Sequence, residues 1–213
     1  MTTYNPRPFN FFWERPKGII VDPVDWSPDL MRVEGQVCAV LKTPDDETIE
    51  VFETKNIVTT AGSNYYAERA VGTDPMADAL FTDGTSGAVF DGKMYLYNGS
   101  TGTPAAGSNY SAAIAGGTAI STNGNKDMVS GYPKINDADA DNTGSGTYVV
   151  TYYSTWVSGE ATNLDIDNVF ISNPSPAATT NENILMWAQL SPAITKGTSD
   201  TLKVFVNHTL AGA

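Results

Sequence analysis

Histidine and cysteine are almost absent from this chain, and their scarcity limits the chemistry it can perform. Among its 213 residues there is one histidine, His208, and one cysteine, Cys38. A disulfide within the chain is therefore excluded, and so is a zinc site of the usual kind, which needs several such ligands. Any Ser-His-Asp or Cys-His catalytic arrangement would have to use His208.

Basic residues are also scarce, with 12 Lys and Arg against 24 Asp and Glu and a formal net charge of −12. Nucleic-acid binders concentrate Lys and Arg because neutralised phosphates supply much of their affinity. We therefore expect neither nucleic acid nor an anionic membrane as a partner. No run approaches the roughly 18 apolar residues of a membrane helix. Residues 1–8 lack the apolar core of a signal peptide, so we expect synthesis in a cytoplasm.

No residue pattern in the chain identifies a catalytic site. Neither a P-loop nor a dinucleotide-binding glycine motif is present. Carboxylates are plentiful, but nothing marks two of them as a glycosidase pair. His208 falls on the apolar face of a predicted strand at 201–210, which predicts a core residue. Cys38 lies in the apolar run 36–41 and is predicted to be a buried thiol. We expect no enzyme and no cofactor.

The first 35 residues differ from the rest because prolines recur at Pro6, Pro8, Pro16, Pro23 and Pro28. Each proline fixes φ and favours an extended residue before it. The sequence predicts an extended N-terminal arm over residues 1–35 that either wraps its own domain or docks on a neighbour. Its candidate partner-binding residues are Phe9, Phe11, Phe12, Trp13 and Trp26.

Residues 36–213 alternate between strand-like runs and turn residues. The pattern predicts a mainly β protein, an antiparallel β-sandwich with one short helix. The helix is expected from Ser63 to about Ala70, with Ser63 as N-cap and Gly72 as its end. Residues 72–147 are rich in Gly, Ser and Thr and are expected to form long loops around one strand. The predicted strands are 36–42, 48–53, 93–97, 147–157, 164–171, 183–190 and 201–210.

Asp137, Asp139 and Asp141 are the best candidate metal ligands. Three carboxylates at alternate positions resemble the start of a calcium-binding loop. The match then fails, because Asn142 stands where such a loop needs glycine and Tyr148 where it needs glutamate. We expect a solvated acidic turn and no metal.

Three segments, taken in order, carry a resemblance to a known class. A strand with the pattern Asn-x-hydrophobic-Thr enters a short helix over residues 55–67, and a strand runs into a Gly/Thr/Pro loop over residues 94–105. A closing hairpin covers residues 184–204. Together they cover about a third of the chain and resemble tailed-bacteriophage virion proteins, a class of head decoration, tail and fibre-like proteins.

The resemblance implies a non-catalytic structural component of a virion. The leading hypothesis is a capsid decoration (cement) protein that binds across major capsid protein subunits, or another virion protein, as a homo-oligomer on the particle and stabilises the head. The alternatives are a tail or baseplate structural protein and a carbohydrate-binding module of a fibre. The last would need exposed aromatics such as Tyr152, Tyr153 or Trp156, which the strand alternation predicts to be core residues.

Overall fold

The structure, a computed structural model, describes residues 32–71, 92–172 and 184–211. The predicted partner-binding aromatics of the arm lie outside these residues. The ten strands are β1 (Arg32–Lys42), β2 (Thr48–Val58), β3 (Lys93–Asn98), β4 (Thr118–Ala119), β5 (Asn125–Asp127), β6 (Lys134–Ile135), β7 (Val149–Trp156), β8 (Asn163–Ser172), β9 (Ile184–Lys196) and β10 (Thr201–Ala211).

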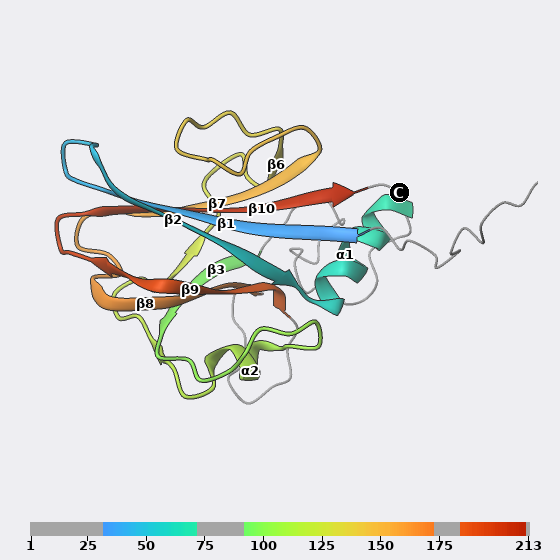
Figure 1. Cartoon of the computed structure of the whole chain (residues 1–213), viewed down its shortest axis with the longest axis horizontal. Coiled ribbons are helices and arrows are strands. Elements are labelled where there is room, and N and C mark those ends of the chain that lie inside the picture. The colour runs from blue at the N-terminus through green and yellow to red at the C-terminus, as the bar shows by residue number, and fades with distance from the viewer. Residues whose placement is uncertain (1–31, 72–91, 173–183, 212–213) are drawn as a thin grey trace, which may run out of the picture. The chain divides into compact units, whose positions relative to one another are not determined.

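All strand pairs are antiparallel, and they follow the order β4-β3-β8-β9-β2-β1-β10-β7-β6, with β5 also on β3. Strand β2 joins the two layers, because Thr48–Asn56 pairs with β1 whereas Ile57 and Val58 pair with β9. The sheet thus curls into two facing layers, one around β1 and β10 and one around β8 and β9 (Figure 1). The predicted antiparallel sandwich is confirmed.

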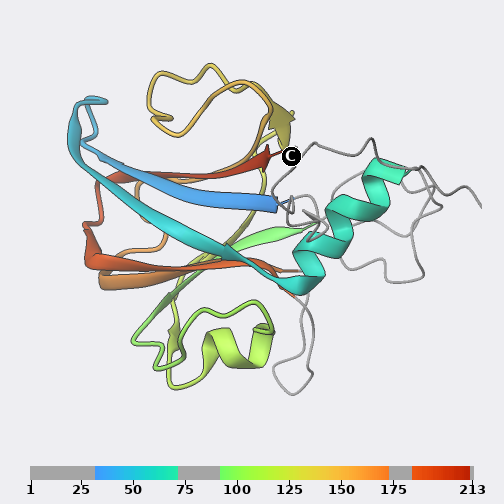
Figure 2. The same ribbon diagram turned by 45° about the vertical axis from the view of Figure 1, so that its right-hand side comes forward.

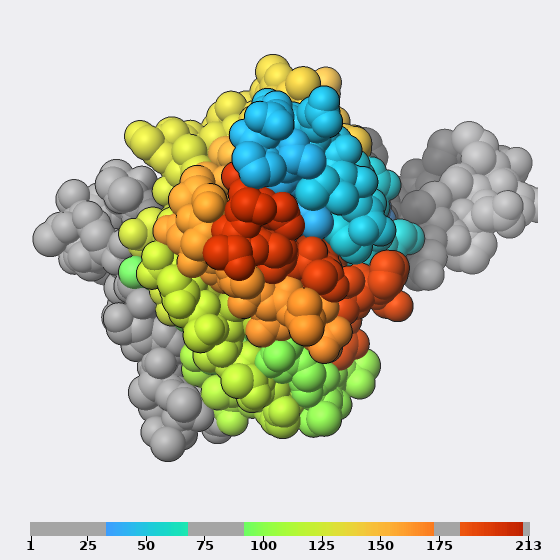
Figure 3. All heavy atoms as spheres, turned by 90° about the vertical axis from the view of Figure 1, so that its left-hand side faces the viewer, coloured from blue at the N-terminus to red at the C-terminus, as the bar shows by residue number. Residues whose placement is uncertain are grey.

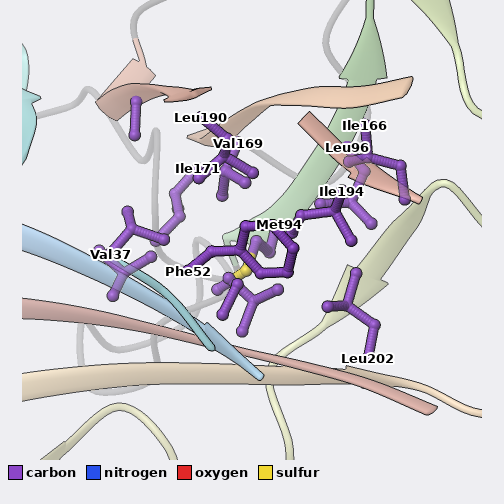
Figure 4. Close-up of a cluster of buried hydrophobic side chains, with 14 of the residues drawn as sticks. Val37, Phe52, Met94, Leu96, Ile166, Val169, Ile171, Leu190, Ile194 and Leu202 are labelled. Atoms are coloured by element: carbon purple, nitrogen blue, oxygen red, sulfur yellow. The ribbon is translucent and has the colours of Figure 1, made fainter. Parts of the chain in front are cut away.

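The core fills the space between the layers because inward and outward residues alternate along each strand. On β10 the predicted inward residues Leu202, Val204 and Val206 are fully buried. Figure 4 shows Leu202, Val37 and Phe52 pointing toward side chains of the other layer. Those facing side chains include Met94, Leu96, Ile166, Val169, Ile171, Leu190 and Ile194.

Helix α1 (Thr60–Val71) begins earlier than predicted. The hydroxyl of Thr59 accepts a hydrogen bond from Gly62 N at 3.0 Å, so Thr59 caps the helix and the assignment of Ser63 as N-cap is wrong. Gly62 brings the helix against β9, since a Cβ there would lie 2.2 Å from Leu185 O. The described part of the helix reaches Val71, and the predicted end at Gly72 lies outside the described residues.

The sequence pattern did not predict one further, very short helix. A second helix, α2 (Tyr110–Ile114), begins at Asn109, whose side chain accepts from Ala112 N. It lies within residues 92–147, which also contain the short strands β4, β5 and β6. The described part of the predicted long loops is therefore more regular than its composition suggested.

Candidate functional site

Several strand ends and helix α1 lie together at one end of the sandwich, named here the α1 end. Strand pairing places them there: the start of β1 pairs with the end of β10, the end of β8 pairs with the starts of β3 and β9, and β2 ends where α1 begins. Figures 1 and 2 show this end on the right, with α1 projecting from it.

A buried polar network underlies the α1 end. His208 Nδ1 lies 2.6 Å from Tyr66 Oη, and His208 Nε2 lies 2.9 Å from Asn56 Nδ2. Tyr66 Oη is also 2.8 Å from Tyr152 Oη. These four side chains come from α1, β2, β7 and β10, and all are buried. The network therefore ties the helix to strands β2, β7 and β10 of one sandwich layer.

Burial decides the charge of His208. It lowers the pKa of the imidazole to about 3, because no charge lies close enough to offset the loss of water. The neutral ring accepts from the Asn56 amide at Nε2, so Nδ1 carries the proton and donates to Tyr66. Burial also raises the pKa of Tyr66, which stays protonated. The prediction that His208 is a core residue is confirmed.

Gly35 makes the network possible. It lies between Asn56 and His208 across three neighbouring strands, paired with Asn56 on β2 and with His208 on β10. A Cβ at Gly35 would stand 1.6 Å from Asn56 Oδ1. The missing side chain lets Asn56 reach across β1 to the imidazole, which sequence reasoning did not foresee.

A groove of about 760 Å³ opens along β1 and β2 beside this network. Its charged side chains are Glu34, Glu53 and Lys55, and its other lining residues include both polar and apolar side chains. No group of three His, Cys, Asp or Glu side chains that could hold a metal ion occurs within residues 32–71, 92–172 and 184–211. The groove thus offers hydrogen bonds and mixed charge. It is lined by residues 33–36 and 53–58, with Ala106, Gly144, Asn207 and Thr209.

The acidic loop does not form the solvated turn that was expected. Asp137 is 5% exposed, and Lys134 Nζ lies 2.7 Å from its carboxylate. Burial alone would raise the pKa of Asp137, but hydrogen bonds from Lys134, Asn142 and Tyr132 lower it to about 2. The expectation is wrong because the carboxylate is packed against the protein and neutralised there.

Asp141 is held in a similar way from the sheet below. Its carboxylate lies 2.9 Å from Lys42 Nζ on β1 and 2.5 Å from Lys203 Nζ on β10. Asp139 reaches Lys203 only at 4.0 Å. Cys38, predicted as a buried thiol and confirmed as one, lies under this loop, where Thr143 Oγ1 donates to its sulfur at 3.2 Å. The loop forms a third layer over the outer face of β1 and β10.

The aromatics considered for carbohydrate binding are inside the protein. Tyr152, Tyr153 and Trp156 are 1%, 8% and 0% exposed. Such buried rings cannot serve as an exposed stacking platform. The strand alternation had favoured a core position for all three, and that prediction is confirmed.

The sequence patterns did not predict two exposed apolar side chains at the α1 end. Tyr148 is 72% exposed and Ile135 is 63% exposed. Tyr148 adopts φ 64°, a conformation that is costly for a bulky residue. Its N–H donates to Asn136 Oδ1 at 3.0 Å, and Leu210 N donates to its carbonyl. An exposed aromatic ring held in strained backbone is a candidate contact for a partner.

Comparison of the chain with protein-family models, with curated proteins and with solved structures finds no match. In the described ranges, no helix has the length and apolar character needed to cross a bilayer. The function must therefore be argued from the arrangement of this molecule.

Proposed function

We propose that this protein is a non-catalytic virion structural protein, a capsid decoration protein that docks through the α1 end of its sandwich. The observation that carries the proposal is the exposed ring of Tyr148, which strained backbone holds at the α1 end of the sandwich. Ile135 is a second exposed apolar side chain at this end. A partner facing this end would meet both side chains.

The N-terminal segment has the reach and the apolar surface for such docking. Thirty-one extended residues span up to about 100 Å. Its candidate anchors Phe12 and Trp13 can each bury on the order of 150–250 Å². With Phe9, Phe11 and Trp26 they would supply much of one partner's share, about 800 Å², of a standard interface.

The same molecule offers little support for catalysis. Its one histidine is buried and hydrogen-bonded on both ring nitrogens. The Asp137 and Asp141 carboxylates are engaged by lysines. A general base needs a proton-accepting group within reach of a substrate, and neither set of side chains is placed to provide one.

Removal of residues 2–30 tests the proposal. The sandwich core lies within residues 32–211, so the truncated protein should keep its melting temperature within a few degrees. It should fail to co-sediment with undecorated particles. The matched control is Leu164→Ala in the full chain, which trims an exposed residue of β8 and should bind normally. Full-strength co-sedimentation by the truncated protein would overturn docking by the arm.

Copy number separates decoration from the tail or baseplate alternative. Densitometry of purified particles should give hundreds of copies for a protein that covers the head. A handful of copies, in multiples of three or six, would instead place the protein in the tail.

A further inference from the structure

Strand β2 presents an edge that no strand in the described residues covers. Along Thr48–Asn56 it pairs with β1 on one side, and pairing with β9 begins only at Ile57. A register shift between Leu41 and Lys42 marks a bulge at the start of this edge. From Glu50 onward the pairing with β1 is regular, so about six residues offer unpaired backbone groups on the outer side.

The exposed side chains of this edge are mainly apolar and acidic, with Lys55 near one end as its only basic side chain. Ile49 is 50% exposed and Val51 is 44% exposed. Glu47, Glu50 and Glu53 are exposed beside them. Natural sheet edges are usually protected by lysine, proline or a covering segment. A single lysine near one end leaves most of this edge matched to an extended segment that carries apolar and basic side chains. Figure 3 shows β1 and β2 in blue and teal at the surface of the molecule.

We propose that the β2 edge binds the segment Phe9–Arg15 of a second copy of this chain as an added strand. The seven residues lie between Pro8 and Pro16, so every one of them has an N–H to donate. In an extended chain alternate side chains share a face, which places Phe9, Phe11 and Trp13 together. Those rings match the exposed apolar side chains of the edge.

Charge favours the same pairing. Arg7, Arg15 and Lys17 give the first seventeen residues three basic side chains against Glu14 alone, whereas the whole chain carries −12. The basic flanks meet the exposed glutamates of the edge. Two acidic bodies repel each other, and an exchanged basic segment lowers that repulsion.

The length of the connection favours a neighbouring molecule over the segment's own body. Sixteen residues separate Arg15 from Arg32 and can extend to about 53 Å. Strand β2, with 11 residues, is about 36 Å long. A connection longer than the whole strand is more than the chain needs to reach its own edge, and it suffices to reach an adjacent copy.

This inference rests on the proposed function only in treating the N-terminal segment as a docking element. It identifies one partner of that segment as a second copy of the same chain. Disulfide trapping in full chains tests it. One chain carries Phe11→Cys and the other Val51→Cys, both with Cys38→Ser. The two proteins are mixed at high concentration under mild oxidation and run on a non-reducing gel. A disulfide forms only if the two Cβ atoms come within about 4.5 Å.

We expect a mixed dimer that is at least tenfold more abundant than with the matched control Leu164→Cys, which is 73% exposed but lies away from the β2 edge. Equal yields at positions 51 and 164 would overturn the inference. So would a purely intramolecular disulfide in the double variant Phe11→Cys/Val51→Cys without mixed dimers. Co-sedimentation of each variant is measured in parallel, so that normal particle binding without trapping removes the inference and leaves the proposed function standing.

Discussion

The two ends of the sandwich are built in different ways. At the end opposite α1, named here the hairpin end, short turns join consecutive strands and close on themselves. Thr43 N donates to Glu47 O at 2.8 Å, Gly159 N to Thr198 O at 2.7 Å, and Gly197 N to Asp200 Oδ2 at 2.8 Å. At the α1 end a helix is held by one hydrogen-bonded network, and the Tyr148 ring is exposed.

We expect the hairpin end to contribute mainly to stability and the α1 end mainly to binding. The hairpin end satisfies its polar groups internally, as Trp156 Nε1 does with Asn123 O at 2.7 Å and Lys196 Nζ does with Val157 O at 3.2 Å. Burial lowers the pKa of Lys196, which has no water contact. These hydrogen-bonded turns stabilise the hairpin end, whereas the α1 end presents the exposed Tyr148 and Ile135 side chains. We expect mutations at the two ends to affect different measurements.

The largest expected effect is on the hairpin end. Trp156→Ala removes a fully buried indole and should lower the free energy of unfolding by about 3–5 kcal/mol. Chemical denaturation measures this decrease in the free energy of unfolding. The fraction that remains folded should still bind particles normally. Loss of binding by folded Trp156→Ala protein would break the separation of the two ends.

A smaller effect is expected at the α1 end, from pH. The pKa of His208 is about 3 in the folded protein and about 6.5 in an unfolded chain. Between these values the unfolded chain binds a proton that the folded protein does not. The free energy of unfolding should therefore fall as pH falls, by about 1.5 kcal/mol between pH 6.5 and 5.

The control for this pH effect is His208→Gln, which keeps a polar side chain but cannot titrate. Asp137, Asp141 and Glu160 also have lowered pKa values, but their ordinary values are 3.8 and 4.5, so they act mainly below pH 5. Denaturation curves of the unmodified protein and of His208→Gln at several pH values measure how each free energy of unfolding depends on pH. An unchanged slope in His208→Gln would mean that the network at the α1 end does not sense acid.

Local patterns predicted the strands well. Period-two alternation of apolar side chains located β7 and β10, and it assigned His208 and Trp156 to the core. The helix was found but begun three residues late, because Ser63 and Thr59 are both good capping residues and only the packing of Gly62 on β9 separates them. Helix α2 has five residues, too few for a periodic pattern.

The candidate site was harder to predict because its contacts join distant parts of the chain. Asp141 meets Lys42 and Lys203 across 99 and 62 residues, and Tyr66 meets His208 across 142. An acidic run read alone resembles a solvated turn, since nothing nearby in sequence supplies those lysines. The free edge of β2 likewise depends on where β9 begins to pair.

Calcium should have the smallest effect, and it tests whether the acidic loop is a functional region separate from both ends. Asp137 and Asp141 already bind Lys134, Lys42 and Lys203, so a cation would have to displace those lysines. With a dissociation constant above about 10 mM, 1 mM calcium adds only about 0.1 kcal/mol to the free energy of unfolding. Thermal melts with calcium, and with magnesium as control, should coincide within about 1 °C. A rise of several degrees with calcium that Asp139→Ala abolishes would show that the lysines yield to the metal.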